Sequence, residues 1–232
     1  MKHAQTRGLS RRRVEKLLAK TKSYGAAGSR IEVLSRLFLG RPYTINPLIG
    51  SAEEPEVFTT SLNGFDCVTY VETILALSRA STVDEFIEWL RSIRYEGGRV
   101  QWERRNHYMT CWIRNNARTG TLRRVTPRDA ATVVKERILD GLPGLAPVKA
   151  RFECVPKPSM GKLKLQLETG DFIFFASTRR HHDVFHCGIV VRDGGRLLMR
   201  HASRSKGGVV EQELDDFLKT NRMAGVIVAR PQ

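Results

Sequence analysis

The apolar residues of this chain follow a helical period in its first half and a strand-like pattern in its second half. Recurrence every three to four residues predicts helices at 10–18, 31–39, 67–75, 83–96 and 126–140. Apolar runs bounded by glycine, proline or aspartate predict strands at 171–176, 185–192, 196–202 and 225–230, with a short helix at 213–219. A helical half followed by a strand-rich half indicates the α+β class.

Three stretches interrupt this pattern. Residues 43–60 and 141–161 carry several prolines and no clear period, so we expect loops there, with one short strand at 151–155. Residues 104–116 are rich in asparagine, histidine and aromatic side chains, a composition that suits ligand binding. The same composition is typical of a partly buried connection whose polar groups bond to one another, and we favour that interpretation.

Composition sets the size and charge of the protein. Its 232 residues suit one catalytic domain, which we place at 29–232, after a basic N-terminal arm at 1–28. The chain holds 39 Lys and Arg against 24 Asp and Glu, a formal net charge of +15. Such a charge attracts polyanions, which include nucleic acid, an anionic membrane surface and an anionic cell-wall polymer. Because no nucleic-acid reader motif is visible, sequence-specific recognition of nucleic acid is not expected.

The cysteine pattern and the lack of long apolar runs bear on the compartment. The cysteines at 67, 111, 154 and 187 include no C-x-x-C pair, so a disulfide scaffold is not expected. No run of about 18 apolar residues is present, so no transmembrane segment is expected. The N-terminus is basic without an apolar stretch behind it, so no secretory signal is visible. The protein is then made for the cytoplasm, trimmed of a signal, or exported by another route.

Cys67 is a candidate nucleophile because it comes at the predicted start of a helix. Asn63-Gly64 breaks the preceding segment, and Asp66 is placed to accept amide hydrogens of the first helical turn. The N-terminal end of a helix favours an anion, which makes a thiol there easier to ionise. The alternative is that Cys67 is a small buried apolar residue, as many cysteines are.

A predicted hairpin would bring two histidines together on neighbouring strands. Asp193-Gly194 between apolar runs predicts a two-residue hairpin turn, which pairs Arg192 with Gly195 and His186 with His201. Directly opposed residues share one face of a sheet, so the two rings would be close enough to hydrogen-bond. The alternatives are two core histidines bonded to carbonyls, and a metal site formed by His181, His182, His186 and Cys187, whose spacing fits no known ligand set.

Four motifs in order carry a family resemblance: Gly40-Arg41-Pro42-Tyr43, Phe65-Asp66-Cys67, His186-Cys187-Gly188-Ile189-Val190 and His201-Ala202-Ser203. Together they resemble the NlpC-type cell-wall cysteine peptidases, and within them the N-acetylmuramoyl-L-alanine amidase-like branch. The same branch is echoed by Cys67 to Glu72, by Asn106-His107-Tyr108 with Trp112, and by Gly170-Asp171. The resemblance covers about residues 30–230.

The resemblance implies a papain-like fold, in which helices carrying the cysteine pack on an antiparallel sheet carrying the histidines. It implies that Cys67 is the nucleophile, His186 the base and His201 the residue that orients the base. Tyr43, after a longer loop than usual in the family, and the Cys67 backbone N–H would hold the oxyanion. The residues expected to contact substrate are Asp66, Asn106, His107, Tyr108 and His182. No metal and no other cofactor is expected.

The implied activity is hydrolysis of an amide bond in a peptidoglycan stem peptide, either the lactyl–L-Ala bond or the D-Glu–diamino acid bond. The implied partners are peptidoglycan fragments or the cell wall, and the implied location is the bacterial envelope or outside the cell, with the cytoplasm left open. We expect a monomer. Two other functions stay open: an acyltransferase on the same scaffold, and a basic polyanion-binding module without catalysis.

Overall fold

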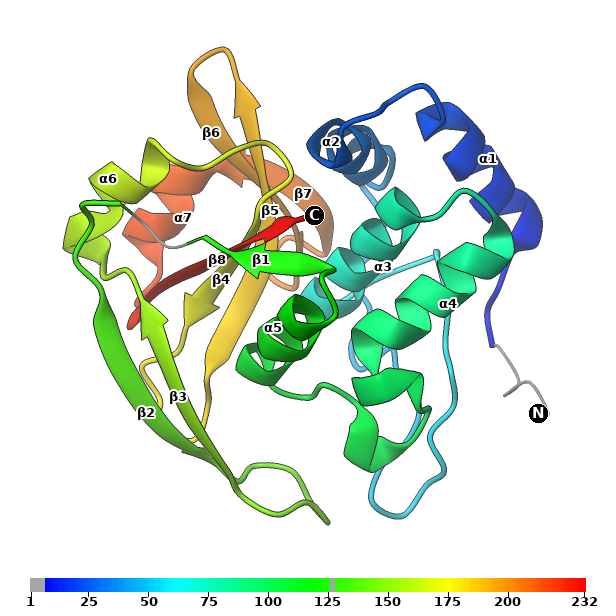
Figure 1. Ribbon diagram of the computed structural model, residues 1–232, viewed down its shortest axis with the longest axis horizontal. Helices are drawn as coiled ribbons and strands as arrows, with labels where there is room; N and C mark the ends of the chain where they lie inside the picture. The colour runs from blue at the N-terminus through cyan, green and yellow to red at the C-terminus, as the bar shows by residue number, and fades with distance from the viewer. Residues whose placement is uncertain (1–6, 126–127) are drawn as a thin grey trace. The chain divides into compact units, whose positions relative to one another are not determined.

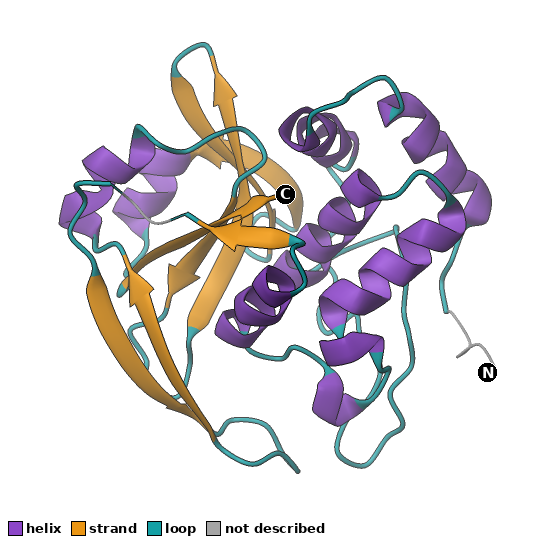
Figure 2. Ribbon diagram, in the orientation of Figure 1, coloured by secondary structure: helices purple, strands orange, loops and turns teal. Residues whose placement is uncertain are grey.

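The computed structural model describes residues 7–125 and 128–232, which form two compact units. The first unit contains the described residues up to Asn106 together with His201–Val210, and the second contains His107–Arg200 and Glu211–Gln232. The first is built mainly of helices and the second mainly of strands (Figures 1 and 2). The α+β class is therefore confirmed, whereas one catalytic domain over 29–232 stays a prediction.

Helices of the first unit surround α3, which is its most buried element. The helices are α1 (Arg11–Thr21), α2 (Ala27–Leu37), α3 (Cys67–Arg79) and α4 (Val83–Arg94), followed by the 3-10 turns η1 (Glu96–Gly98) and η2 (Trp102–Arg104). Every side chain of α3 from Thr69 to Ser78 is buried, and α1, α2 and α4 all contact this helix. Four of the five helices expected from the apolar period are thus present.

Helix α1 shows what the basic N-terminal segment does in the described residues. Val14 is fully buried, and Leu17 and Leu18 are buried beside it, against α2, α3 and α4. Arg11 and Arg12 lie on the exposed side of the same helix. The apolar stripe therefore packs this segment into the first unit, although the boundary of an arm at residue 28 stays a prediction.

The second unit contains a six-stranded sheet in the order β1-β8-β4-β5-β6-β7. Its strands are β1 (Leu122–Arg124), β4 (Phe172–Ala176), β5 (Val184–Asp193), β6 (Arg196–Ser203), β7 (Gly208–Glu213) and β8 (Gly225–Pro231), and the last residues of β6 and first residues of β7 belong to the first unit. The pairs β1–β8, β8–β4, β4–β5 and β5–β6 are antiparallel. The predicted strands of the histidine region are confirmed, and β7 was missed.

Strand β4 is buried over its whole length because both faces of the sheet are covered. On one face, Phe175 packs against Phe217 of helix α7 (Leu214–Thr220), with ring centroids 4.4 Å apart, and helix α6 (Met160–Lys164) completes this core. On the other face, Trp112 of helix α5 (Met109–Arg118) lies 5.7 Å from Phe174. Burial on both faces explains the continuous apolar run of β4.

The predicted helix at 126–140 is wrong, because this segment forms the first strand of a hairpin. Strand β2 (Val133–Leu139) pairs antiparallel with β3 (Val148–Cys154), which extends the short strand expected at 151–155, and the 3-10 turn η3 (Lys157–Ser159) follows. In β2 the burial alternates residue by residue, a strand period that β-branched valines and isoleucine favour. Thr126 and Pro127, which suggested the helix start, lie outside the described residues.

The predicted register of the histidine hairpin is also wrong, by two residues. Asp193 pairs with Arg196 and Ile189 with Arg200, so the turn is Gly194-Gly195 and not Asp193-Gly194, and a ladder continued in this register would not put His186 directly opposite His201. Both turn residues have positive φ, 53° and 90°, which glycine adopts without a steric cost, whereas Asp193 stays extended in the ladder. A shift of two residues keeps the alternation of faces, so a shared face for the two histidines stays a prediction.

Candidate active site

Cys67 is the first residue of α3, where the sequence predicted it. Asp66 caps the helix: its Oδ1 accepts from the Thr69 backbone N at 2.7 Å, and the Asp66 backbone N donates to Thr69 Oγ1 at 3.1 Å. This reciprocal capping box fixes the start of the helix at Cys67. The thiol therefore lies at the positive end of a thirteen-residue helix.

The carboxyl group of Asp66 is electrostatically unusual. Burial raises the pKa of Asp66 to about 6, and the negative charge of the adjacent Cys67 thiolate adds to the rise, against the opposing hydrogen bonds from Thr69. The two neighbouring side chains therefore compete for negative charge at one helix start. Asp66 serves as a cap here, and its predicted contact with substrate stays a prediction.

The loop that carries Tyr43 is fixed beside the segment that precedes Cys67. Phe65 donates its backbone N to Pro42 O at 3.1 Å and accepts from Thr44 N at 2.9 Å, so Tyr43 forms a parallel bridge with Phe65. A Cβ at Gly64 would lie 2.2 Å from Thr44 Oγ1, which explains the glycine at this close approach. Although 22 positions separate Tyr43 from Phe65 in the sequence, their backbones are paired, and Phe65 is only two positions before Cys67.

The same loop is also tied to the segment after His201. Tyr43 donates its backbone N to Gly207 O at 2.8 Å, and Val209 donates to Arg41 O at 2.7 Å. His201 itself, at the end of β6, is only 2% exposed. Within the first unit, backbone hydrogen bonds thus connect three of the four motif regions: the Tyr43 loop, the start of α3 and the chain after His201.

A buried ion pair anchors α3 in the first unit, and sequence analysis did not predict it. Arg94 Nε lies 2.7 Å from Glu72 Oε2, and each side chain is 2% exposed. Arg94 also donates Nη1 to Thr59 O at 2.6 Å, which ties α3 and α4 to the loop before Cys67. The signal was a charged residue on an otherwise apolar face of each helix, because a buried charge needs a partner.

Asn106 is used to connect backbone segments. It is buried, its Nδ2 donates to Ile93 O at 3.1 Å, and its backbone N donates to Arg94 O at 2.9 Å. These contacts match the interpretation of 104–116 as a connection with its own hydrogen bonds. The helix α5 inside that stretch was not predicted.

In the second unit, His186 lies on β5 opposite Phe175. Its ring stacks on Phe217 with centroids 5.4 Å apart and an interplanar angle of 24°, and on Phe175 at 6.3 Å and 18°. The aromatic rings hold the imidazole plane in one orientation while the residue remains half-buried. His186 is therefore oriented by packing within its own unit.

The start of α5 is held by a residue far along the chain. Asp183, 2% exposed, accepts through Oδ2 from the backbone N of Thr110 at 2.7 Å and from its hydroxyl at 2.8 Å. Its Oδ1 accepts from the backbone N of Val184, the first residue of β5, at 2.7 Å. Asp183 thus joins the N-terminus of α5 to the strand that carries His186.

Tyr108 is the N-cap residue of α5, and both it and His107 are half-buried. Burial raises the pKa of Tyr108, and the carboxylates of Asp183 and Asp140 contribute to this rise. His182 lies exposed in the turn before Asp183, and the adjacent His181 places Nδ1 2.8 Å from Asp140 Oδ1. His107, Tyr108 and His182 therefore all belong to the second unit, close in sequence or contact to Asp183.

The described residues contain no group of three or more His, Cys, Asp or Glu that could hold a metal ion. None of the four cysteines, which all lie in the described ranges, forms a disulfide. Cys67 and Cys111 are half-buried, whereas Cys154 and Cys187 are buried, and burial raises the pKa of Cys154. Within 7–125 and 128–232, no helix is both long and apolar enough to cross a membrane.

Two solved structures share this architecture. A protein from Legionella pneumophila str. Philadelphia 1, of family DUF1460, has a TM-score of 0.84 at 20% identity, covering 95% of this chain and 94% of its own. An N-acetylmuramoyl-L-alanine amidase from Bacteroides uniformis ATCC 8492 has a TM-score of 0.79 at 24% identity, covering 90% of this chain and 100% of its own. The comparison with curated proteins finds no match.

These likenesses place the chain in a class of mixed α/β proteins with an antiparallel sheet, the fold of the Bacteroides amidase. The AmiA-like family model, described as N-acetylmuramoyl-L-alanine amidase-like, matches residues 33–226. The chain belongs to this N-acetylmuramoyl-L-alanine amidase-like family. Membership supports an amidase-like function on the bacterial cell wall.

Proposed function

We propose that the protein is a cysteine-dependent hydrolase that cleaves an amide bond in peptidoglycan stem peptides. The observation that carries the proposal is the placement of Cys67 as the first residue of a buried, capped helix, in a chain of the amidase-like family. A thiol at the positive end of a helix is a better nucleophile at neutral pH, because more of it is thiolate.

In the proposed mechanism, the Cys67 sulfur attacks the amide carbonyl carbon and forms a C–S bond. His186, which has taken the thiol proton, gives it to the leaving nitrogen as the C–N bond breaks. Water then loses a proton to His186 and adds to the thioester, and the C–S bond breaks to release the acid and the thiol. His201 is assigned to orient His186, as the third member of such triads does.

The oxyanion of each tetrahedral intermediate would be held by the backbone N–H of Cys67 and by Tyr43. The backbone N–H groups in the first turn of a helix form its positive end, so that of Cys67 suits this role. The backbone bridge between Tyr43 and Phe65 supports the assignment of Tyr43, because it holds the Tyr43 loop at the start of α3. One such donor contributes about 3–4 kcal/mol to transition-state stabilisation in measured cases.

The finer classification belongs to the same proposal. The papain-like arrangement and the NlpC-type superfamily are supported by the four ordered motifs and by the two units, one carrying the cysteine helix and the other the histidine strand. Asp66, Asn106, His107, Tyr108 and His182 are proposed to contact the substrate. We further propose that the protein acts as a monomer in the cell envelope or outside the cell, without a cofactor.

The test is mass spectrometry of defined muropeptides after incubation with the wild-type protein and with the Cys67→Ala variant. Cys111→Ala is the matched control, since Cys111 is also a half-buried cysteine in the first turn of a helix. The fragment masses distinguish the lactyl–L-Ala bond from the D-Glu–diamino acid bond. Hydrolysis that survives Cys67→Ala would refute the cysteine mechanism, and transfer of the acyl group to an added amine would favour an acyltransferase.

A further inference from the structure

A groove lined by arginines lies between helix α5 and strand β3 in the second unit. Its cationic side chains are Arg114, Arg118, Arg124 and Arg151, and its volume is about 410 Å³. None of the described residues that line it is acidic. We name these four residues the arginine groove. Four like charges around one concave surface repel each other, so the arrangement favours an anion within it.

The charges of this groove are not neutralised by neighbouring acids. Among residues 7–125 and 128–232, no carboxylate lies within ion-pair distance of Arg114, Arg118 or Arg124. Arg114 donates to Cys111 Sγ at 3.5 Å, and Arg124 donates to the backbone oxygen of Glu153 at 3.2 Å. Arg151 lies 3.6 Å from Glu136, but both side chains are more than 70% exposed, so water screens this pair.

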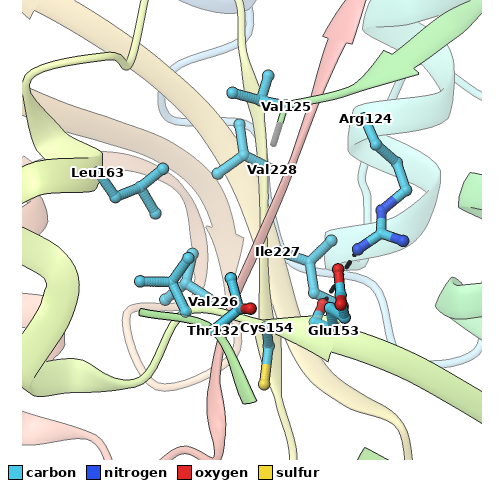
Figure 3. A pocket seen from close by; sticks show the side chains of 10 residues that line it. Arg124, Val125, Thr132, Glu153, Cys154, Leu163, Val226, Ile227 and Val228 are labelled. Carbon is cyan, nitrogen blue, oxygen red and sulfur yellow. Dashed lines mark hydrogen bonds between the residues drawn. The ribbon is translucent and has the colours of Figure 1, made fainter. Parts of the chain in front are cut away.

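Arg124 also lines a second, small pocket, together with apolar residues (Figure 3). Figure 3 shows its guanidinium beside Glu153, whereas Leu163 and Val226 lie on the far side of this pocket. That pocket has a volume of only about 20 Å³, room for about one water molecule, and carries no ligand argument. The free surface for a ligand is therefore on the arginine side.

The cationic surface continues along the hairpin of β2 and β3. A second groove shares Ala150 and Arg151 with the first and adds Arg137, Lys149 and Arg180, with Glu136 as the only acid among its described lining residues. Strand β3 has seven residues and is thus roughly 20 Å long at about 3.3 Å per residue. A surface of this length offers several charges in a row, which suits a chain of anionic groups better than a single small anion.

The floor of the arginine groove indicates which kind of polyanion it fits. Aliphatic side chains such as Ile113 and Ala117 line it, and its one described aromatic residue, Phe152, is only 6% exposed. Proteins that bind single-stranded nucleic acid stack the bases on exposed aromatic rings, which this groove does not offer. An arginine guanidinium can donate two parallel hydrogen bonds to two oxygens of one phosphate. Arginines without exposed aromatic rings therefore favour phosphodiester groups that carry no bases.

We propose that the arginine groove binds a linear phosphodiester polymer that carries no bases, such as a polyol phosphate chain. The site is separate from the residues assigned to catalysis, so it would attach the protein to an anionic polymer without taking part in hydrolysis. Binding would depend steeply on salt, because each neutralised phosphate releases counterions.

The experiment measures binding of synthetic poly(glycerol phosphate) to the full chain by calorimetry at several salt concentrations. The double variant Arg118→Glu with Arg124→Glu should bind the polymer with an affinity lower by about tenfold or more. The slope of its log affinity against log salt concentration should be shallower by about 1.4, at about 0.7 per lost contact. The control Lys157→Glu with Lys162→Glu makes the same charge change at exposed positions outside the groove and should bind nearly as the wild type.

Each other outcome contradicts the proposal. Equal losses in both double variants would mean that overall charge, and not the groove, attracts the polymer. An RNA oligomer with the same number of phosphates that bound more tightly than poly(glycerol phosphate) would show that the groove prefers nucleic acid. If the Glu variant does not fold, as judged by circular dichroism, Arg118→Gln with Arg124→Gln replaces it, and unchanged binding there would overturn the proposal. Hydrolysis of a small soluble muropeptide should be the same in all folded variants.

Discussion

Helices α3 and α5 both begin at a segment that carries proposed site residues, but the two helix starts are capped in different ways. Helix α3 is capped by residues that are neighbours in sequence, Asp66 and Thr69. Helix α5 begins after Tyr108, whose side chain, within the described structure, makes no capping hydrogen bond, and its amide at Thr110 is satisfied by Asp183, 73 positions later. One helix start is encoded locally, and the other exists only after the chain has folded.

The difference matters for the proposed chemistry. The cap of α3 is formed by residues next to Cys67 in the sequence, whereas Asp183 fixes the start of α5 and the first residue of β5 at the same time. The strand that carries His186 is therefore coupled to a helix end through one buried carboxylate. The helix start at the proposed nucleophile is capped locally, whereas the strand of the proposed base is held by a tertiary contact.

The largest expected effect falls on the base. His186→Ala should reduce hydrolysis about 10⁴-fold or more, because no other assigned group can take the thiol proton. His201→Ala should leave a folded, weaker enzyme, since the base remains but loses its orientation. His181→Ala, at an exposed turn outside the strand, is the control and should change turnover little. Steady-state kinetics on a muropeptide decide this, and equal losses in all three variants would contradict the assignment.

The two helix starts also explain what sequence could and could not predict. The expected Asp66 cap and the apolar period predicted α3, and the apolar run of β4 predicted a buried strand, because both signals are local. Helix α5 and strand β2 were missed, since a distant carboxylate caps one and pairing with β3 selects the other. The turn was misplaced by one residue, which shifts the pairing register by two, because Asp-Gly and Gly-Gly both permit a hairpin and only the pairing of the two strands decides between them.

For the candidate site, the sequence predicted Cys67 at a helix start with Asp66 as its cap, but it did not predict which distant residues support that helix. The buried Glu72–Arg94 pair joins residues 22 positions apart, and nothing in their spacing predicts that contact. The Tyr43 loop is long, yet backbone bonds to Phe65 and Gly207 hold it. Such contacts form only in the folded protein. The order of the motifs could therefore suggest the site residues, but not the ion pair and backbone hydrogen bonds that hold them in place.

The second prediction compares the two thiols that lie in first turns. Cys67 should be alkylated roughly 100-fold faster than Cys111 near neutral pH, because Cys67 is the proposed activated nucleophile beside an imidazole. Cys154 and Cys187 should react more slowly still, since both are buried. Time-resolved alkylation with peptide mapping measures the rates. Faster labelling of Cys111 than of Cys67 would contradict the assignment of Cys67 as the reactive thiol.

The third prediction compares the two caps as sources of stability. Asp183→Ala should lower the free energy of unfolding by about 2–3 kcal/mol, because it leaves the buried amides of Thr110 and Val184 without their acceptor. Asp66→Ala should cost about 1 kcal/mol, the usual loss of an N-cap. Urea unfolding of the two variants measures the difference. A larger loss of unfolding free energy in Asp66→Ala than in Asp183→Ala would show that the local cap contributes more to stability than the distant one.

The smallest expected effect is the pH dependence of Asp66. Its pKa is raised in the folded protein to about 6, from an ordinary value of 3.8, so the native state binds more protons than the unfolded state between these values. The free energy of unfolding should therefore fall as the pH rises from about 4 to about 6, and the full cost of ionising Asp66 is present above pH 6.

Asp66→Asn keeps a capping oxygen but removes this ionisation, so it should flatten that part of the pH profile. We expect the variant to gain about 1–2 kcal/mol relative to the wild type above pH 6, less than the full shift implies because the side chain is partly exposed. In Cys67→Ala the pKa of Asp66 should move down toward its ordinary value, because the thiolate charge that helps to raise it is gone. An NMR titration of the Asp66 carboxyl follows this shift. An unchanged pKa in that variant would mean that burial alone raises it, and that Cys67 carries no negative charge when Asp66 titrates.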